Sequence, residues 1–207
     1  MYLRILKKDL KRKKTMNVIL LIFVALAATF IASSASNLLT VSNALDNYFK
    51  RADIPDYWFA STSSSDIQRF EEFAGANGYD YHISRLIQID PQNVSAEGEK
   101  LNYANTLALS TLGGINIFDK SNDRLTHVND GEIYVPGFIF HSTKNDFHEG
   151  GKIRIVQDGV EKEFTVRGYT KDALFGSAMV GITRFLISEN DLALFDGESA
   201  AVCSTVE

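Results

Sequence analysis

The first strong pattern along the chain is a long run of apolar residues without charge. No charged residue lies within residues 15–45, and residues 16–32 contain ten Val, Ile, Leu or Phe residues. Extended through Ser36, the most apolar part has about 20 residues, which is enough to cross a hydrocarbon core of roughly 30 Å. The pattern therefore predicts a transmembrane helix over residues 15–36.

The charge that precedes this run predicts its orientation. Residues 1–14 carry seven Lys or Arg residues against one acid, Asp9, so they sum to +6, and the rest must sum to −11 to give the net charge of −5. Cations that flank a span stay in the cytoplasm. We therefore expect a protein of the cell (plasma or inner) membrane, with residues 1–14 cytoplasmic and residues 37–207 extracytoplasmic.

The alternative is a signal peptide cleaved near Ser34–Ser36, where the residues are small enough for a cleavage site. The apolar run is longer than the roughly 7–15 residues typical of a signal peptide. Helical spacing also continues beyond it. An uncleaved span is therefore favoured.

The spacing that continues beyond the span predicts a helical stalk and linker over residues 37–56, with the helix broken at residues 52–56 because Pro55 disfavours helix in the residue before it. Four apolar side chains share one face of this helix: Leu38, Val41, Leu45 and Tyr48. Such a seam is expected to pack against another helix.

The basic segment has an apolar side of its own. Leu3, Leu6 and Leu10 recur at helical spacing among the cations. This pattern is typical of an amphipathic helix on the inner leaflet, and it makes the three leucines a candidate docking face for a cytoplasmic partner. A segment that acts only as a topology anchor would carry the same charge.

Residues 57–91 show a second pattern, in which a short aromatic strand is followed by a helix and another strand. Ser65 and Gln68 fit a capping box at the start of the helix. The three elements together predict a compact βαβ-like unit.

Residues 92–207 contain short strands separated by Gly, Asn and Asp turns, which predicts a β-rich part. Its clearest element is a hairpin with strands over 152–157 and 161–169. Asp158-Gly159 between them is typical of a two-residue turn of type I′. The outer part is thus expected to be α+β.

Composition and charge exclude several classes. An acidic outer part argues against nucleic acid as a partner, because phosphate binding needs clustered Lys and Arg. Cys203 is the one cysteine, so an intramolecular disulfide or a multi-cysteine zinc site is excluded.

The candidate catalytic motifs fail on inspection. Gly150-Gly151-Lys152 resembles the end of a phosphate-binding loop, but Asp146 and Ile153 stand where that pattern needs Gly and Ser or Thr. No G-x-S-x-G surrounds a serine. We therefore predict a subunit that is not an enzyme, with no catalytic residue and no cofactor.

Two histidines are candidate metal ligands. His141 and His148, with Asp146 and Glu149 nearby, could ligate a metal in principle. Their spacing does not match H-E-x-x-H, and the stretch is typical of a solvated loop. No metal site is predicted.

Two stretches, read together with the order of elements, resemble the permease subunits of MacB/FtsX-type ABC transporters. They cover about half of the chain and are LRILKKDLKRKKTMNVILLIFVALAATFIASSASNL and GEIYVPGFIFHSTKNDFHEGGKIRIVQDGVEKEFTVRGYTKDALF. Neither is an invariant motif. The first holds the basic start and the span, and the second holds the glycine pair, the hairpin and the F-T-V-x-G strand.

The resemblance implies a fold with two outer lobes. Residues 57–91 would be the first half of a porter-like α/β lobe, and residues 92–207 a β-rich lobe inserted into it. Residues 199–206 look like a strand that stops at the chain's end. The resemblance therefore implies that the domain is incomplete, as in an N-terminal fragment or a truncated gene product.

The resemblance also implies a function and partners. The permease couples ATP hydrolysis on a separate ATP-binding-cassette subunit to movement of the outer domain, for export or mechanotransmission. A second permease copy or homologue, the lipid membrane and an extracytoplasmic accessory protein are the other expected partners. The seam would then be the coupling contact of the stalk.

A different class of function stays open. The chain could be a single-span, membrane-anchored module that binds a ligand or adheres, without any ATPase. A cytoplasmic part of 14 residues leaves no room for a signalling domain, which counts against a sensor. An anchored extracytoplasmic enzyme has no residues to support it.

Overall fold

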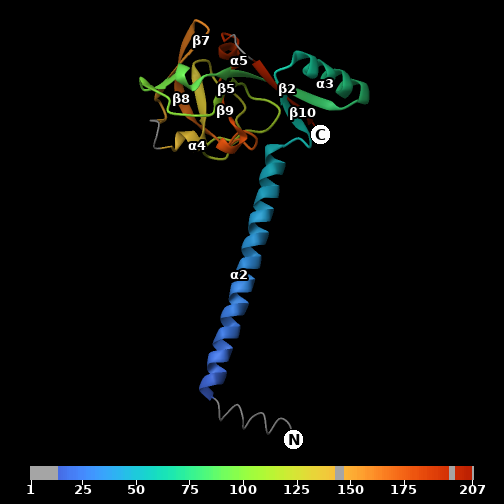
Figure 1. The fold of residues 1–207 in the computed structure, drawn as a ribbon, viewed down its shortest axis with the longest axis vertical. Helices are drawn as coiled ribbons and strands as arrows, with labels where there is room; N and C mark the ends of the chain where they lie inside the picture. Colours follow the sequence, from blue (N-terminus) through green and yellow to red (C-terminus); the bar gives the residue numbers. More distant parts are fainter. Residues whose placement is uncertain (1–13, 143–146, 196–198, 207) are drawn as a thin grey trace. The chain divides into compact units, whose positions relative to one another are not determined.

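The computed structural model describes residues 14–142, 147–195 and 199–206. It divides into two units, Met1–Tyr48 and Phe49–Glu207, which are described separately (Figure 1). The predicted docking face of Leu3, Leu6 and Leu10 lies outside the described residues.

The first unit is built on helix α2, Lys14–Ala52, whose last turn belongs to the second unit. Its 39 residues make it about 58 Å long, roughly twice the thickness of a hydrocarbon core. Its large apolar side chains are exposed from Met16 to Leu45. The helix is long and apolar enough to cross a membrane. The predicted span and the predicted stalk are thus one continuous helix.

Helix α2 ends where Pro55 predicts a break, by a defined capping motif. Asp53 has a φ of 54°, in the left-handed region. The Asp53 amide donates to the Lys50 carbonyl and the Ile54 amide to the Phe49 carbonyl, both at 3.3 Å. These are the two hydrogen bonds of a Schellman motif, which satisfies the last carbonyls of the helix.

The second unit is α+β, with a mixed ten-stranded sheet in the order β1-β10-β2-β5-β9-β6-β8-β7-β3-β4. The strands are β1 Trp58–Ser61, β2 Asp80–Ile89, β3 Val94–Ala96, β4 Glu99–Lys100, β5 Thr106–Ser110, β6 Glu132–Pro136, β7 Lys152–Gln157, β8 Val160–Thr170, β9 Ile182–Leu186 and β10 Ser199–Val206. The helices are α3 Ser64–Asn77, α4 Gly137–Phe140, α5 Glu189–Leu192 and two 3₁₀ turns, η1 Pro91–Asn93 and η2 Ala178–Val180.

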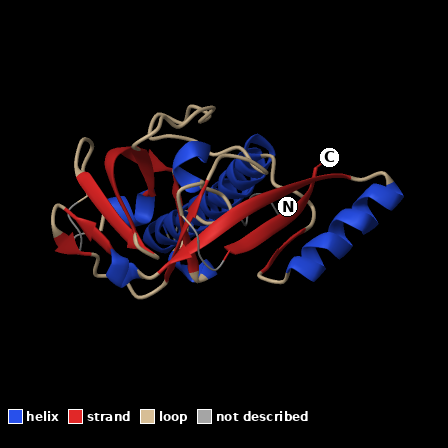
Figure 2. Ribbon diagram, turned by 90° about the horizontal axis from the view of Figure 1, so that it is seen from above, coloured by secondary structure: helices blue, strands red, loops and turns tan. Residues whose placement is uncertain are grey.

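The predicted strand–helix–strand unit forms as β1, α3 and β2, but its two strands are not neighbours. Strand β10 lies between them and pairs antiparallel with both. This is a split βαβ arrangement, and α3 lies along this end of the sheet (Figure 2). The last predicted strand, 199–206, thus pairs with the first elements of the outer part.

The start of α3 corrects the predicted capping box. Ser63, not Ser65, is the N-cap, and its hydroxyl accepts from the Asp66 amide at 3.3 Å. Gln68 donates to Glu72 along the helix instead of reaching back. Several serines precede the helix, so the pattern alone did not determine which one turns into the cap.

The hairpin is confirmed. Gln157 pairs with Val160, and the two turn residues Asp158 and Gly159 have φ of 49° and 83°, as a type I′ turn requires. Along β8, alternate residues are buried, Phe164 among them. Lys152 and Glu163, like Arg154 and Glu161, form exposed cross-strand ion pairs.

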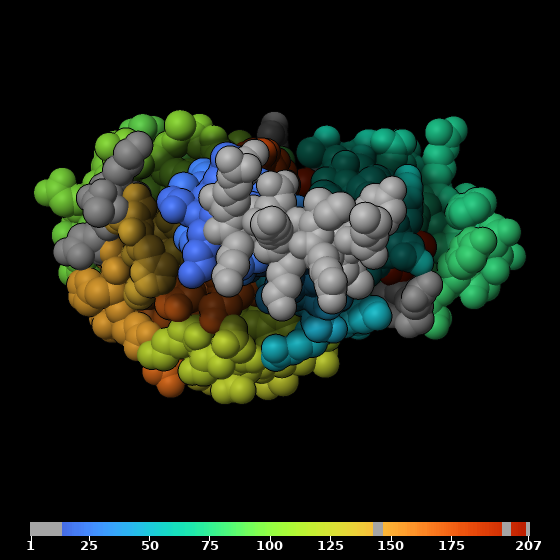
Figure 3. Space-filling view, turned by 90° about the horizontal axis from the view of Figure 1, so that it is seen from below, coloured from blue at the N-terminus to red at the C-terminus, as the bar shows by residue number. Residues whose placement is uncertain are grey.

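The main core lies at the hairpin end and the middle of the sheet. It is made of buried side chains from β2, β5, β6, β7, β8 and β9, with Phe195 following α5. In the space-filling view, the blue-green residues around α3 lie at one end, and the orange residues of the hairpin lie at the other, beside yellow-green residues (Figure 3). One sheet spans both expected lobes, so the two-lobe division stays a prediction.

Candidate functional site

The last turn of helix α2 belongs to the second unit and is held within it by a set of contacts that we call the joint, made of Arg51, Ala52, Asn116, Phe118 and Asn122. Ala52 is fully buried, and its carbonyl accepts from the Asn116 amide at 2.8 Å. The Asn116 side chain donates to the Arg51 carbonyl at 3.0 Å. Both carbonyls lie in the last turn of α2, so the loop takes hydrogen-bonding groups that a helix end leaves open.

The Arg51 side chain makes the second half of the joint. Its Nη2 donates to the Asn122 carbonyl at 3.1 Å, and its guanidinium lies 4.9 Å from the centre of the Phe118 ring. A guanidinium over a ring at this distance is a cation–π contact. The joint therefore holds both the backbone carbonyl and the guanidinium of Arg51.

The loop that holds the helix end is itself tied to the sheet. Phe118 and Lys171 exchange two backbone hydrogen bonds, of 3.1 and 2.8 Å. The Lys171 ammonium donates to the Asn122 side chain at 2.7 Å and to the Lys120 carbonyl at 3.0 Å. Lys171 directly follows β8, so a chain of contacts runs from the last turn of α2 to the central part of the sheet.

The predicted seam lies on the same helix, before the joint. All four residues are on α2, and the side chains of Leu38, Val41 and Leu45 are exposed while Tyr48 is half-buried. The structure thus bears out the helix that carries the seam. Its packing against another helix stays a prediction.

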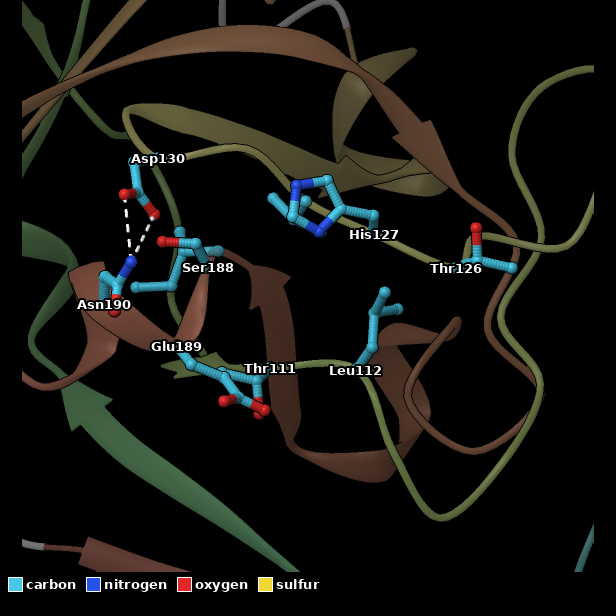
Figure 4. Close-up of a pocket in the computed structure, with 10 residues that line it drawn as sticks. Thr111, Leu112, Thr126, His127, Asp130, Ser188, Glu189 and Asn190 are labelled. Carbon is cyan, nitrogen blue, oxygen red and sulfur yellow. Dashed lines mark hydrogen bonds between the residues drawn. The ribbon is translucent and has the colours of Figure 1, made fainter.

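A polar cavity of about 350 Å³ lies at the carboxyl ends of two central strands, β5 and β9 (Figure 4). These strands are parallel, so their carboxyl ends lie side by side, and β6 begins at the same place. The residues that follow or precede these strands line the cavity: Thr111, Leu112, Thr126, His127, Val128, Asp130, Ile187, Ser188, Glu189 and Asn190.

The wall of this cavity is held by hydrogen bonds to two carboxylates. The two carboxylate oxygens of Asp130 accept from the side-chain amide of Asn190, at 3.0 and 3.3 Å. Hydrogen bonds from Ser188 and Asn190 lower the pKa of Asp130 below its ordinary value. The buried Asp191 accepts from the Gly131 amide at 2.6 Å and pairs with Lys162 at 2.9 Å, which ties α5 to the loop before β6.

The cavity can bind a polar ligand, but its residues are not arranged for nucleophilic chemistry. Ser188 is the N-cap of α5, and its hydroxyl accepts from the Asp191 amide at 3.1 Å. Carboxylate, amide and imidazole groups suit hydrogen bonding to a small hydrophilic molecule. The sequence alone did not indicate the cavity, because its three segments meet only through strand order.

The metal candidates do not assemble in the part of the chain that the structure describes, where no group of three or more His, Cys, Asp or Glu side chains could hold a metal ion. His141 packs edge-on against Tyr169, with ring centres 4.7 Å apart. Asp146 lies outside the described residues. Gly150 has a φ of 84°, and Gly150 and Gly151 precede β7 as a turn.

The buried thiol of Cys203 lies in β10, and burial raises its pKa. Its side chain is part of the buried interior of the domain.

No protein-family model matches the sequence, and no match was found among curated proteins either.

Proposed function

We propose that the chain is the permease subunit of a MacB/FtsX-type ABC transporter, which couples ATP hydrolysis by a partner subunit to movement of its outer unit. The single observation that carries the proposal is the joint: the last turn of a helix long enough to cross a membrane is held by side-chain and backbone contacts within the outer unit. A passive anchor needs no such contacts.

The proposed orientation follows from charge. Seven Lys or Arg residues in residues 1–14 hold the N-terminus in the cytoplasm, which puts Phe49–Glu207 outside. An ATP-binding-cassette subunit would then act on the cytoplasmic end of α2, near Leu3, Leu6 and Leu10. The split βαβ arrangement of β1, α3, β2 and β10 supports a porter-like lobe in the outer unit.

Force transmission requires two contacts along α2. The seam of Leu38, Val41, Leu45 and Tyr48 would pack against the stalk of a second span, from this permease or a second copy. The joint would pass displacement of the helix to Lys171 and the sheet. An extracytoplasmic accessory protein would take up the resulting movement.

The test compares matched variants in the complex. The full chain is purified with the ATP-binding-cassette subunit that accompanies it, and ATPase activity is measured together with a fluorescence signal from the outer unit. Arg51→Met removes the guanidinium contacts of the joint, whereas Lys50→Met removes the same charge from the same turn. We expect the first to keep ATPase activity and lose the outer response, and the second to keep both.

The seam is tested by a second pair. Leu45→Asp puts an unpaired charge into a contact from which water is excluded, which is costly, while Asn43 points away from the seam and should accept Asn43→Asp. Uncoupling by Leu45→Asp alone supports the proposal. Equal behaviour within both pairs, or the absence of any ATP-binding-cassette subunit from the purified complex, would refute it.

A second candidate function is favoured by the polar cavity between α5 and the loop before β6. An anchored ligand-binding module without ATPase coupling would use Asp130 and Asn190 to hold a hydrophilic ligand. In that case the outer unit would bind its ligand with no ATP-binding-cassette subunit present, and Arg51→Met would leave binding unchanged.

A further inference from the structure

Among the described residues, strand β1 is an open edge of the ten-stranded sheet, with β10 as its neighbour on one side only. The Tyr57 carbonyl accepts from the Thr205 amide at 3.1 Å, so it faces β10. Hydrogen-bonding residues alternate along an antiparallel strand, which directs the backbone groups of Trp58 and Ala60 to the outer edge. Soluble proteins usually protect such an edge with charge, proline or a bulge, and Trp58–Ser61 has none of these.

An aromatic groove of about 520 Å³ lies beside this edge, between α3 and the ends of β1, β2 and β10. Its walls are mostly apolar and carry exposed rings, with Phe73 exposed by 61%, Tyr57 by 58% and Tyr79 by 54%. Phe59 and Phe70 form its floor in edge-to-face contact, with ring centres 5.3 Å apart. Exposed aromatic side chains gathered around a groove are typical of binding surfaces.

The chain segment that supplies most of the groove is net acidic. Residues 53–80 carry six acids and one base, Arg69, for a net charge of −5. Asp66 and Arg69 line the groove itself. A basic ligand is therefore attracted to it, and ammonium or guanidinium groups can also lie over the exposed rings.

We propose that this groove and the β1 edge form a docking site for an extended, basic and apolar segment of a partner protein. The segment adds a strand to β1 through backbone hydrogen bonds at Trp58 and Ala60. Every second side chain of the added strand lies on the same face of the sheet as Phe59 and enters the groove. In strand addition, backbone hydrogen bonds usually give the affinity and pockets for alternate side chains give the specificity. The inference goes beyond the proposed function, because it depends on neither the ATPase nor the joint.

Charge disfavours two other occupants. A second copy of this chain would bring the same net charge of −5 against itself, and like charges oppose such a contact. An acidic segment would be repelled in the same way. Charge thus selects a basic partner over a self-paired edge.

The test uses the full chain in phosphatidylcholine nanodiscs, whose neutral surface does not attract a basic peptide. The probe is a fluorescent synthetic peptide in which lysine alternates with phenylalanine, and binding is measured by anisotropy. We expect saturable binding that is lost when glutamate replaces lysine in the probe. Equal binding of both peptides would overturn the proposal.

Matched variants separate strand addition from simple adhesion. Ala60→Pro removes the outward amide and Ala60→Val keeps it, so binding should weaken by about tenfold or more in the first only. Phe73→Ser should weaken binding without unfolding the protein, because Phe73 is largely exposed; Met179→Ser, at a side chain exposed by 95% outside the groove, should not. Unchanged binding in both Ala60→Pro and Phe73→Ser, or efficient disulfide cross-linking of two copies through Ala60→Cys, would refute the proposal.

Discussion

The edge strands at the two ends of the sheet differ in length and in the side chains that they carry. At the hairpin end, the edge strand β4 has only two residues, Glu99 and Lys100, both charged and exposed. Ile153, Ile155 and Phe164 behind it are fully buried. At the other end, the edge strand β1 carries Trp58 and Phe59 and adjoins a groove with exposed rings.

This difference separates an end that stabilises the domain from an end that is available for contact. A short charged edge discourages further strand pairing, and a continuous buried face behind it contributes to the free energy of unfolding. An apolar groove at an open edge contributes less to folding, because its side chains remain in water. Side chains of the same type should therefore have unequal effects on stability at the two ends.

The largest expected effect tests this inequality directly. Phe164→Ala removes a fully buried ring that stacks with Phe195, with ring centres 6.3 Å apart. It should lower the free energy of unfolding by about 3–5 kcal/mol, through lost burial and the cavity left behind. Phe73→Ala, at the open end, should cost less than about 1 kcal/mol. Denaturant titration of the full chain in detergent micelles measures both.

A comparable loss in the two variants would break the comparison, because it would mean that Phe73 is as important to the folded state as the core. A small loss for Phe164→Ala would mean that the hairpin end is not the stable one.

A smaller effect is expected in the turn of the hairpin. Gly159 has a φ of 83° and no atom within 4 Å of an added Cβ, so Gly159→Val is strained by backbone conformation alone. It should lower the free energy of unfolding by about 1–3 kcal/mol. Gly159→Asn is the control, since Asn tolerates the left-handed region better. Equal melting temperatures for the two variants would show that the turn does not need a positive φ.

Local signals explain which elements could be predicted from the sequence. The hairpin was predicted because its turn, its alternation and its register depend on residues 152–170 alone. The long helix and its end near Pro55 were predicted from composition and from the restriction that proline places on the residue before it. Strand β9, Ile182–Leu186, gives only a weak local signal, because Gly181 precedes it and the polar Thr183 and Arg184 lie within it.

Long-range pairing explains what could not be predicted. Nothing local indicates that β10 inserts between β1 and β2, since these strands are far apart in the sequence. The buried Arg184 is paired with Asp172 at 2.6 Å, and neither residue looks like a core residue by itself. The joint, the polar cavity and the aromatic groove likewise depend on segments that only the tertiary fold brings together.

The coupling proposal depends on the outer unit lying on the extracytoplasmic side of the membrane, and thiol labelling of intact cells measures this most directly. The background is Cys203→Ser, which removes the buried native thiol. In it, Asp66→Cys on the exposed side of α3 should react with a membrane-impermeant maleimide in intact cells, and Lys13→Cys should react only after lysis. The reverse pattern would contradict the orientation and, with it, the coupling of a cytoplasmic ATPase to the outer unit.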